Sequence, residues 1–241
     1  MPQTLSELVS RRFGEQIELD REQPFSDTHL LQLQHRSCRR FLQTPVPEKT
    51  LRFLFACSLS APSKSDLQQV SIIHLESKDS RDFIHSVLPS MPWIKTAPVF
   101  LLFCGDSHRI QTVCEMHNTT FAHDPLDAFF NTVTDTAMVL QNFIIAAEAA
   151  GLGCCPISAV REFTEQVAKF CLMPDGVYPL AGLCLGYPEG SRDISVRLPM
   201  SISLHKDKYN ERNLKARIKD YDTRREEINP YESQRQIDLY G

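Results

Sequence analysis

One long apolar helix is the strongest constraint that the sequence places on the fold. Asp124 and Pro125 are a favourable N-cap and first helical residue, and the helical pattern continues to Gly151. Such a helix has about 26 residues and a length of roughly 39 Å. It carries no Lys or Arg, and apolar side chains occur around much of its circumference. We therefore expect a central core helix, buried on more than one side, that can also pack against its copy in a second subunit. The apolar set is Phe129, Phe130, Val133, Met138, Val139, Phe143, Ile144 and Ile145.

The composition is that of an ordinary globular protein. The chain has 241 residues, 42% hydrophobic and 23% charged residues, and a formal net charge of -4. These values favour neither a nucleic-acid nor a membrane partner. Residues 1–5 lack the features of a secretory signal, and no uncharged apolar run reaches the length of about 18 residues that a membrane span requires. We therefore expect a cytoplasmic protein.

Helical and strand patterns alternate along the chain without internal repeats. This pattern predicts one α/β (α+β) domain over residues 1–241, with a helical extension at 1–34 and a C-terminal arm at 192–241. The arm, from Arg192 onward, is charged and expected to be irregular, either as a solvated surface or laid across a partner subunit. Further helices are expected at 4–14, 26–33, 47–59 and 160–171, and strands at 70–75, 97–104, 154–157 and 180–185.

Cysteine and histidine chemistry receives little support. The eight cysteines mostly occur in apolar surroundings, without a signal peptide or a Cys-x-x-Cys pair, so buried reduced thiols are expected. The one candidate metal cluster is His108, Cys114, His117 and His123. Because its surroundings are polar and loop-like, a solvated surface is favoured over a zinc site, and no metal is predicted.

Five short segments occur in an order that is typical of a known family. They are residues 35–41 (HRSCRRF), 61–68 (APSKSDLQ), 149–153 (AAGLG), 180–188 (LAGLCLGYP) and 197–199 (RLP). Together they resemble the FMN-dependent nitroreductase family, and more closely its NADPH-preferring subfamily of oxygen-insensitive nitroreductases and flavin reductases. The likeness spans residues 27–221. It implies a three-layer sandwich, in which helices flank a mixed sheet and the long helix lies at a homodimer interface.

The resemblance also implies which residues bind FMN. His35 and Ser37 would bind the phosphate, Arg36 the phosphate or the ribityl chain, and Arg197 would complete the phosphate site. Arg39 would reach the pyrimidine edge of the flavin, where a cation stabilises the negative charge that hydride transfer places there. No residue is expected to act as a general acid or a nucleophile.

Two further segments would line the flavin ring. Ser63, Ser65 and Gln68 correspond to a loop along the flavin edge, and Lys64 of this loop could supply a positive charge. Residues 156–159 would lie over the flavin N5 atom. These residues are Pro156, Ile157, Ser158 and Ala159.

Four departures from the family pattern concern this site. The segment 156–159 replaces Tyr-Ile-Gly-Gly, so that Pro156 offers no backbone N–H and two glycines are lost. Ser195 replaces a lysine two residues before Arg197, and Asp66 replaces an asparagine. Residues 90–93 replace a polar Gly-x-Gln-like segment, and for their Trp93 a core position is favoured over a lid on the ligand.

The resemblance implies an FMN-dependent NAD(P)H oxidoreductase that passes electron pairs by a ping-pong mechanism. Its expected acceptors are nitroaromatics, quinones or free flavin, and NADPH or NADH is the reductant. The departures support an alternative, a nitroreductase-fold protein that binds flavin or another ligand with lost or specialised activity. A third hypothesis, a zinc hydrolase built on the histidine cluster, is disfavoured.

Overall fold

The computed structural model of the protein describes residues 4–19, 25–122, 124–190 and 193–230. The chain forms two compact units. The larger is Ser37–Arg192, and the second combines Met1–Arg36 with Asp193–Gly241. The second unit therefore draws on both ends of the chain.

Four strands form one sheet in the larger unit, in the order β1-β2-β4-β3. All three neighbouring pairs are antiparallel, which corrects the expectation of a mixed sheet for the described strands. The physical reason is the strand order: β2 and β3 run in the same direction, but β4 lies between them. The strands are β1 (Val70–His74), β2 (Val99–Asp106), β3 (Gly153–Ile157) and β4 (Val177–Gly186).

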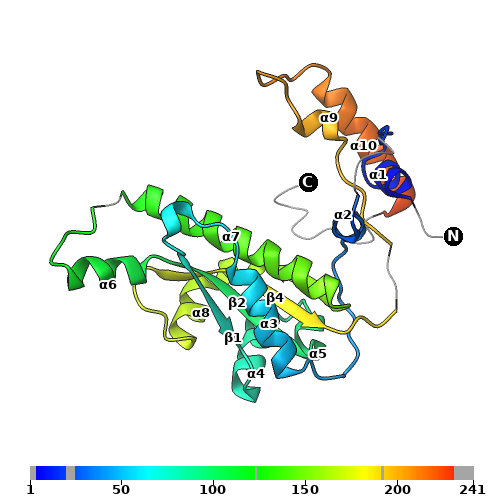
Figure 1. Cartoon of the computed structure of the whole chain (residues 1–241). Helices are drawn as coiled ribbons and strands as arrows, with labels where there is room; N and C mark the ends of the chain where they lie inside the picture. The colour runs from blue at the N-terminus through cyan, green and yellow to red at the C-terminus, as the bar shows by residue number, and fades with distance from the viewer. Residues whose placement is uncertain (1–3, 20–24, 123, 191–192, 231–241) are drawn as a thin grey trace. The chain divides into compact units, whose positions relative to one another are not determined.

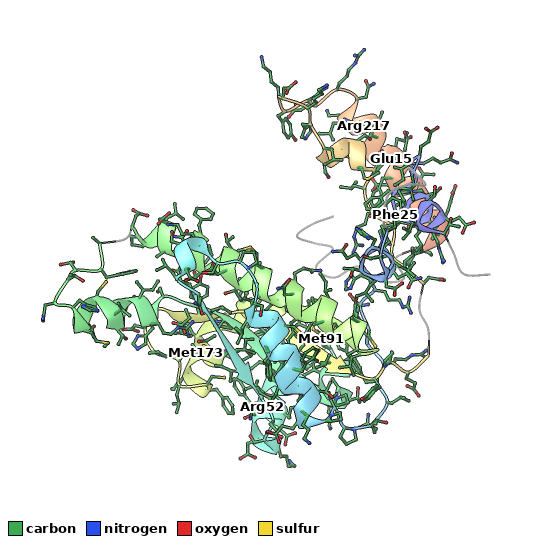
Figure 2. The ribbon with its side chains drawn as sticks, in the orientation of Figure 1. Glu15, Phe25, Arg52, Met91, Met173 and Arg217 are labelled. Atoms are coloured by element: carbon green, nitrogen blue, oxygen red, sulfur yellow. The ribbon has the colours of Figure 1, made fainter. Side chains whose placement is uncertain are left out.

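Helices cover both faces of this sheet, which confirms the three-layer arrangement (Figure 1). Along β2, Phe100 and Leu102 belong to one core cluster, whereas Leu101 and Phe103 belong to the other, as expected of a strand buried on both faces. Met91, labelled in Figure 2, belongs to the first cluster. The first face is covered by α4 (Lys78–Val87), α5 (Trp93–Thr96) and α8 (Thr164–Phe170), and the second by α3 (Glu48–Leu59) and α7 (Pro125–Ala149).

The long helix predicted from Pro125 is confirmed as α7. The Asp124 side chain accepts hydrogen bonds from the two backbone N–H groups of Leu126 and Asp127, as an N-cap does. Only one side of the helix is buried within the chain. Near its N-terminus, the other side exposes Leu126 (61%) and Phe130 (58%), and Phe129 (47%), whose ring stacks on Tyr178, is exposed in part. Burial on more than one side, as the sequence predicts, is thus not achieved by the chain alone.

Two local predictions in the larger unit need correction. The helix expected at 160–171 begins as a 3-10 helix, η2 (Ser158–Phe163), and only then continues as α8. The loop expected around His108 is a helix, α6 (His108–Met116), in which Ile110, Val113 and Cys114 follow helical spacing. The sequence did not indicate this helix because its one apolar stripe is short and most of its residues are polar.

The second unit is helical. The predicted helices α1 (Leu5–Phe13) and α2 (Asp27–Gln34) are confirmed, and they begin at the caps Thr4 and Ser26. The expectation of an irregular tail is wrong, because residues 200–203 and 214–228 form α9 (Met200–Ser203) and α10 (Leu214–Ile228). The expected start of that tail, Arg192, lies outside the described residues. Glu15, labelled in Figure 2, accepts hydrogen bonds from the Met200 and Ser201 N–H groups at the start of α9.

The cysteines are reduced, and half of them are buried. All eight thiols are free, and Cys104, Cys154, Cys155 and Cys184 are buried. Burial raises the pKa of each buried thiol, to about 12 for Cys104, which makes them poor nucleophiles. Among the helices of the described ranges, none is long and apolar enough to span a membrane.

Candidate cofactor-binding site

In the second unit, Arg12 joins the segment that ends in His35 to the segment that contains Arg197. Arg12 is only 5% exposed, and its guanidinium donates from Nε to the Leu33 carbonyl (3.0 Å) and from Nη2 to the His35 carbonyl (2.5 Å). Its own carbonyl accepts the N–H of Arg197 at 2.6 Å. Two predicted phosphate ligands from opposite ends of the chain are thus tied to one buried residue. Arg36, which is predicted to bind the phosphate or the ribityl chain, is exposed.

The side chain of Arg197 is exposed and oriented by a neighbour. Its Nη1 donates to the Ser195 hydroxyl at 2.6 Å. Ser195 is the residue that replaces the family lysine, so the chain has one positive charge fewer here but gains a hydrogen bond that orients Arg197. The carbonyl of Arg197 accepts from Nη2 of Arg224 on α10, also at 2.6 Å.

In the larger unit, the segment with Ser37 and Arg39 lies against β3. The Cys38 N–H donates to the Cys154 carbonyl at 2.7 Å. The approach is close enough to require Gly153, because a Cβ atom added there would lie 2.7 Å from Cys38 Cβ. Arg39 is therefore held next to the β3 edge of the sheet.

Arg39 is an exposed cation with an aromatic support. Its guanidinium lies 5.4 Å from the centre of the Trp93 ring, a cation–π geometry, and it forms no ion pair with any described residue. Trp93 is half-buried and packs against the first core cluster, in keeping with the core position that the sequence favours. Burial raises the pKa of the nearby Cys155 thiol, and the charge of Arg39 partly offsets that rise.

Residues 156–159 lie at the end of β3. Ile157 is buried, Pro156 and Ser158 are exposed, and Ala159 is half-buried. β3 is an edge strand, which is where a sheet tolerates a proline. Two of the four predicted residues are therefore exposed at the end of the strand against which the Arg39 segment lies.

The predicted flavin-edge loop, residues 63–68, has an unusual backbone. Three of its non-glycine residues have left-handed conformations: Ser65 (φ 52°), Asp66 (φ 58°) and Gln68 (φ 50°). Each such residue costs on the order of 1 kcal/mol and persists only where the surroundings impose it. Within the loop, the Ser63 hydroxyl accepts the Gln68 N–H at 2.7 Å. Lys64 is exposed.

Asp135 of α7 imposes this loop conformation. Its side chain is buried, with the residue 1% exposed, and its two carboxylate oxygens accept the N–H groups of Lys64 (2.8 Å) and Gln69 (3.0 Å). The sequence analysis missed Asp135. The available signal was a carboxylate in the middle of an otherwise apolar helix, which needs partners if it is to be buried.

Arg109 of α6 holds the other end of the same loop. It donates from Nη2 to the carbonyls of Gln68 (2.5 Å) and Val70 (2.6 Å) and forms an ion pair with Asp106 at 2.9 Å. Ser63, Gln68, Arg109 and Asp135 line a pocket of about 240 Å³ at this position. Asp66, the substituted asparagine, is exposed, and its carboxylate accepts from the Gln68 amide at 3.4 Å.

The predicted residues of the larger unit fall on opposite edges of the sheet. The loop 63–68 leads into β1, and Arg39 with residues 156–159 lies along β3. Three strand spacings separate these edges, or about 14 Å. One copy of this unit does not bring the two groups together.

A metal centre has no support in the described parts of the chain. His108 and Cys114 lie on α6, and His117 caps its C-terminus. His123 lies outside the described residues. Among the residues that are described, no group of three or more His, Cys, Asp or Glu side chains could hold a metal ion.

Comparison with known proteins decides the family. Residues 33–187, well over half of the chain, match the model of the nitroreductase family. The chain belongs to the nitroreductase family. An FMN reductase [NAD(P)H] of Bacillus subtilis (strain 168) is 33% identical over 204 residues, which cover 83% of this chain and 81% of that protein. An oxygen-insensitive NADPH nitroreductase of Salmonella typhimurium is 34% identical over 175 residues, which cover 73% and 71%.

A solved structure agrees with this assignment. NADPH:FMN oxidoreductase from Vibrio harveyi, in complex with NAD⁺, superimposes with a TM-score of 0.78 at 29% identity, covering 83% of this chain and 84% of that one. The nitroreductase fold expected from the sequence is therefore confirmed. The family match begins at residue 33 and ends at 187, so α1 with Arg12, α10 with Arg224, and Arg197 itself lie outside it.

The residues present fit the FMN of a nitroreductase. Arg39 is an exposed cation without an ion-pair partner in the described residues, and Arg197 is an exposed cation whose backbone is fixed on both sides. Such donors suit a phosphate and a ring that becomes anionic on reduction. The pocket at Ser63 and Gln68 adds hydroxyl and amide groups.

Proposed function

We propose that this chain is an FMN-dependent NAD(P)H oxidoreductase that reduces nitroaromatics, quinones or free flavin. One observation carries the proposal within the nitroreductase assignment: His35 and Arg197, both expected at the FMN phosphate, are tied to the same buried Arg12. Its relatives are named FMN reductase and NADPH nitroreductase, and these names support both the cofactor and the reductant.

The role of the chain's own residues is to bind FMN and to orient it. Bound FMN would supply the chemistry of hydride transfer between the reduced nicotinamide and the acceptor. His35, Ser37 and Arg197 hold the phosphate, with Arg36 at the phosphate or the ribityl chain. Arg39, supported by Trp93, supplies positive charge where the reduced ring becomes negative.

The remaining residues complete the ring site. Ser63, Ser65 and Gln68 line the ring edge, with Lys64 beside them, and the loop keeps its shape through Asp135. Residues 156–159 would form the surface over the ring. None of these groups needs to transfer a proton in the first half-reaction.

We further infer a homodimer in which two copies complete each site. Three observations support it: the predicted groups lie on opposite edges of the sheet, α7 exposes Phe129 and Phe130, and neither edge alone offers all the expected contacts. A second copy can cover the exposed side of α7 and bring its own β1 edge to the first copy's β3 edge. Use of NAD(P)H and eight free thiols fit a cytoplasmic enzyme.

Anaerobic spectroscopy tests the function directly. The purified full chain is mixed with FMN and then with NADPH, and flavin absorbance near about 450 nm is followed. Bound flavin that bleaches on NADPH addition is the expected result. Flavin that does not bind, or that binds and does not bleach, would contradict the proposed reductase.

The second candidate function is a flavin- or ligand-binding protein with lost or specialised activity. Pro156 favours it, because this exposed residue offers no backbone N–H where the family pattern has one. Pro156→Tyr separates the two functions. If Pro156→Tyr leaves the NADPH half-reaction unchanged, Pro156 does not limit activity; if flavin bleaches only in the variant, the second candidate is correct.

A further inference from the structure

The α1 helix carries a buried arginine, Arg12, that contacts the segment of a predicted FMN ligand. Arg12 lies outside the matched residues 33–187, yet its side chain is almost completely buried. Burial of an arginine is costly unless each donor finds an acceptor. Here the acceptors include the carbonyls of Leu33 and His35, so Arg12 joins α1 to the C-terminal end of α2.

These carbonyls are the ones that a helix leaves without partners. α2 ends at Gln34 with His35 as its C-cap, and its last turn contains no basic residue of its own. The last carbonyls of a helix have no intrahelical donors and carry the negative end of the helix dipole. Arg12 supplies both the donors and the positive charge that α2 lacks, and it fixes the backbone of His35.

The same residue fixes Arg197. The carbonyl of Arg12 accepts the Arg197 N–H, and Arg224 of α10 donates to the Arg197 carbonyl. Both backbone groups of Arg197 are therefore fixed by residues outside the family match. Gly14, at the end of α1, is needed for this packing: it has φ 69°, and a Cβ atom there would collide with the Arg224 guanidinium.

We propose that Arg12 is a positioning residue for the phosphate end of the cofactor site. It does not touch the ligand; it sets the distance and orientation between His35 and Arg197. The inference rests on the proposed function, because it takes these two residues as phosphate ligands. It predicts that α1 contributes to FMN affinity through the phosphate alone.

The test compares FMN with riboflavin, which lacks the phosphate, in binding to the full chain freed of flavin. For Arg12→Gln, FMN should bind about tenfold more weakly while riboflavin affinity changes less than about twofold. Arg12→Lys keeps the charge and one donor direction and should recover part of the loss. The matched control is Arg11→Gln, one residue earlier on α1, whose ion pair with Asp193 is exposed and which should leave both affinities unchanged.

Each outcome has one meaning. If the Arg12→Gln chain folds and binds FMN as tightly as the unaltered chain, or loses FMN and riboflavin affinity equally, the positioning role is overturned. If Arg12→Gln does not fold, Arg12→Lys gives the same comparison with a smaller expected loss. If the unaltered chain binds neither ligand, the proposed function itself fails, which separates that failure from failure of the Arg12 inference.

Discussion

Two parts of the proposed FMN site are each held by one buried charged residue, and the charges have opposite sign. Asp135 accepts N–H groups from the loop 63–69, whereas Arg12 donates to carbonyls at the end of α2. The difference follows from the backbone groups that need partners. A tight loop with left-handed residues turns N–H groups inward, and a helix C-terminus leaves carbonyls unpaired. The unsatisfied backbone group thus determines which charge the fold buries.

The comparison predicts its largest effect at Asp135. Asp135→Ala leaves two backbone N–H groups without acceptors beside a loop that is already strained. We expect the free energy of unfolding to fall by about 3 kcal/mol or more, because unsatisfied buried donors cost about 1–3 kcal/mol each. Urea denaturation measures the change. Gln141→Ala, an exposed position on the same helix, is the control and should change little. A loss for Asp135→Ala of less than about 1 kcal/mol would show that the loop holds its own shape.

The next effect concerns the exposed side of α7, which a second copy covers in the proposed homodimer. Phe130→Lys should weaken the homodimer by about 2 kcal/mol, or roughly thirtyfold in dissociation constant, because a charge replaces a buried aromatic ring. Analytical ultracentrifugation over a dilution series measures it. Leu172→Lys, at a residue that is 88% exposed, is the matched control. Equal dissociation constants for both variants and the unaltered chain would place the dimer contact elsewhere.

A smaller effect is expected at the Arg39 cation, which neither Asp135 nor Arg12 holds. Arg39→Gln removes positive charge near the reduced ring and should lower the two-electron midpoint potential of bound FMN by about 30 mV, equivalent to about 1.4 kcal/mol. Trp93→Phe keeps the charge with a weaker aromatic support and should lower it less. Arg40→Gln, the exposed neighbour, should not shift the potential. Potentials from dye equilibration that agree for all four proteins would remove Arg39 from the ring site.

The smallest effect concerns the sheet core between the two edges. Burial raises the pKa of Cys104 from 9.0 to about 12. As the pH rises, this thiol ionises in the unfolded chain at a lower pH than in the folded chain. Its contribution to stability is therefore complete below pH 9 and is lost as the pH rises towards 12. One such thiol contributes at most about 1.4 kcal/mol per pH unit in that window. Cys104→Ala should make the decline in unfolding free energy less steep by somewhat under about 1 kcal/mol between pH 8 and pH 9.5, measured by urea titration. An unchanged slope would mean that Cys104 does not ionise on unfolding in this range.

The sequence predicted elements whose signals are local. The helices expected at 4–14 and 26–33 and the long helix that begins after Asp124 are confirmed by the structure. α10 was missed because its charges dominate, although Leu214, Ile218 and Tyr221 follow helical spacing. Local sequence signals also could not predict which strands are neighbours in the sheet. The position of β4 between β2 and β3 depends on contacts between residues far apart in the chain.

The residues expected to contact FMN stay predictions, and the sequence analysis missed the two buried residues that hold their segments. The family motifs predict His35, Arg39 and Arg197 as FMN-binding residues, because a ligand's chemistry restricts residue type within a short segment. Asp135 and Arg12 bind backbone groups 66 to 71 and 21 to 23 residues away, respectively, so no short segment carries the pattern. A charged residue within an apolar stretch is the signal that would find such supports.

Sedimentation of the FMN-loaded chain, followed at the flavin absorbance near about 450 nm, tests most directly whether two copies build each site. A dilution series through the dimer dissociation constant should show flavin sedimenting with the dimer and released as monomer appears, because a ligand that binds only the dimer stabilises it. Flavin that sediments with the monomer, at undiminished affinity, would contradict a site made from the β1 edge of one copy and the β3 edge of another.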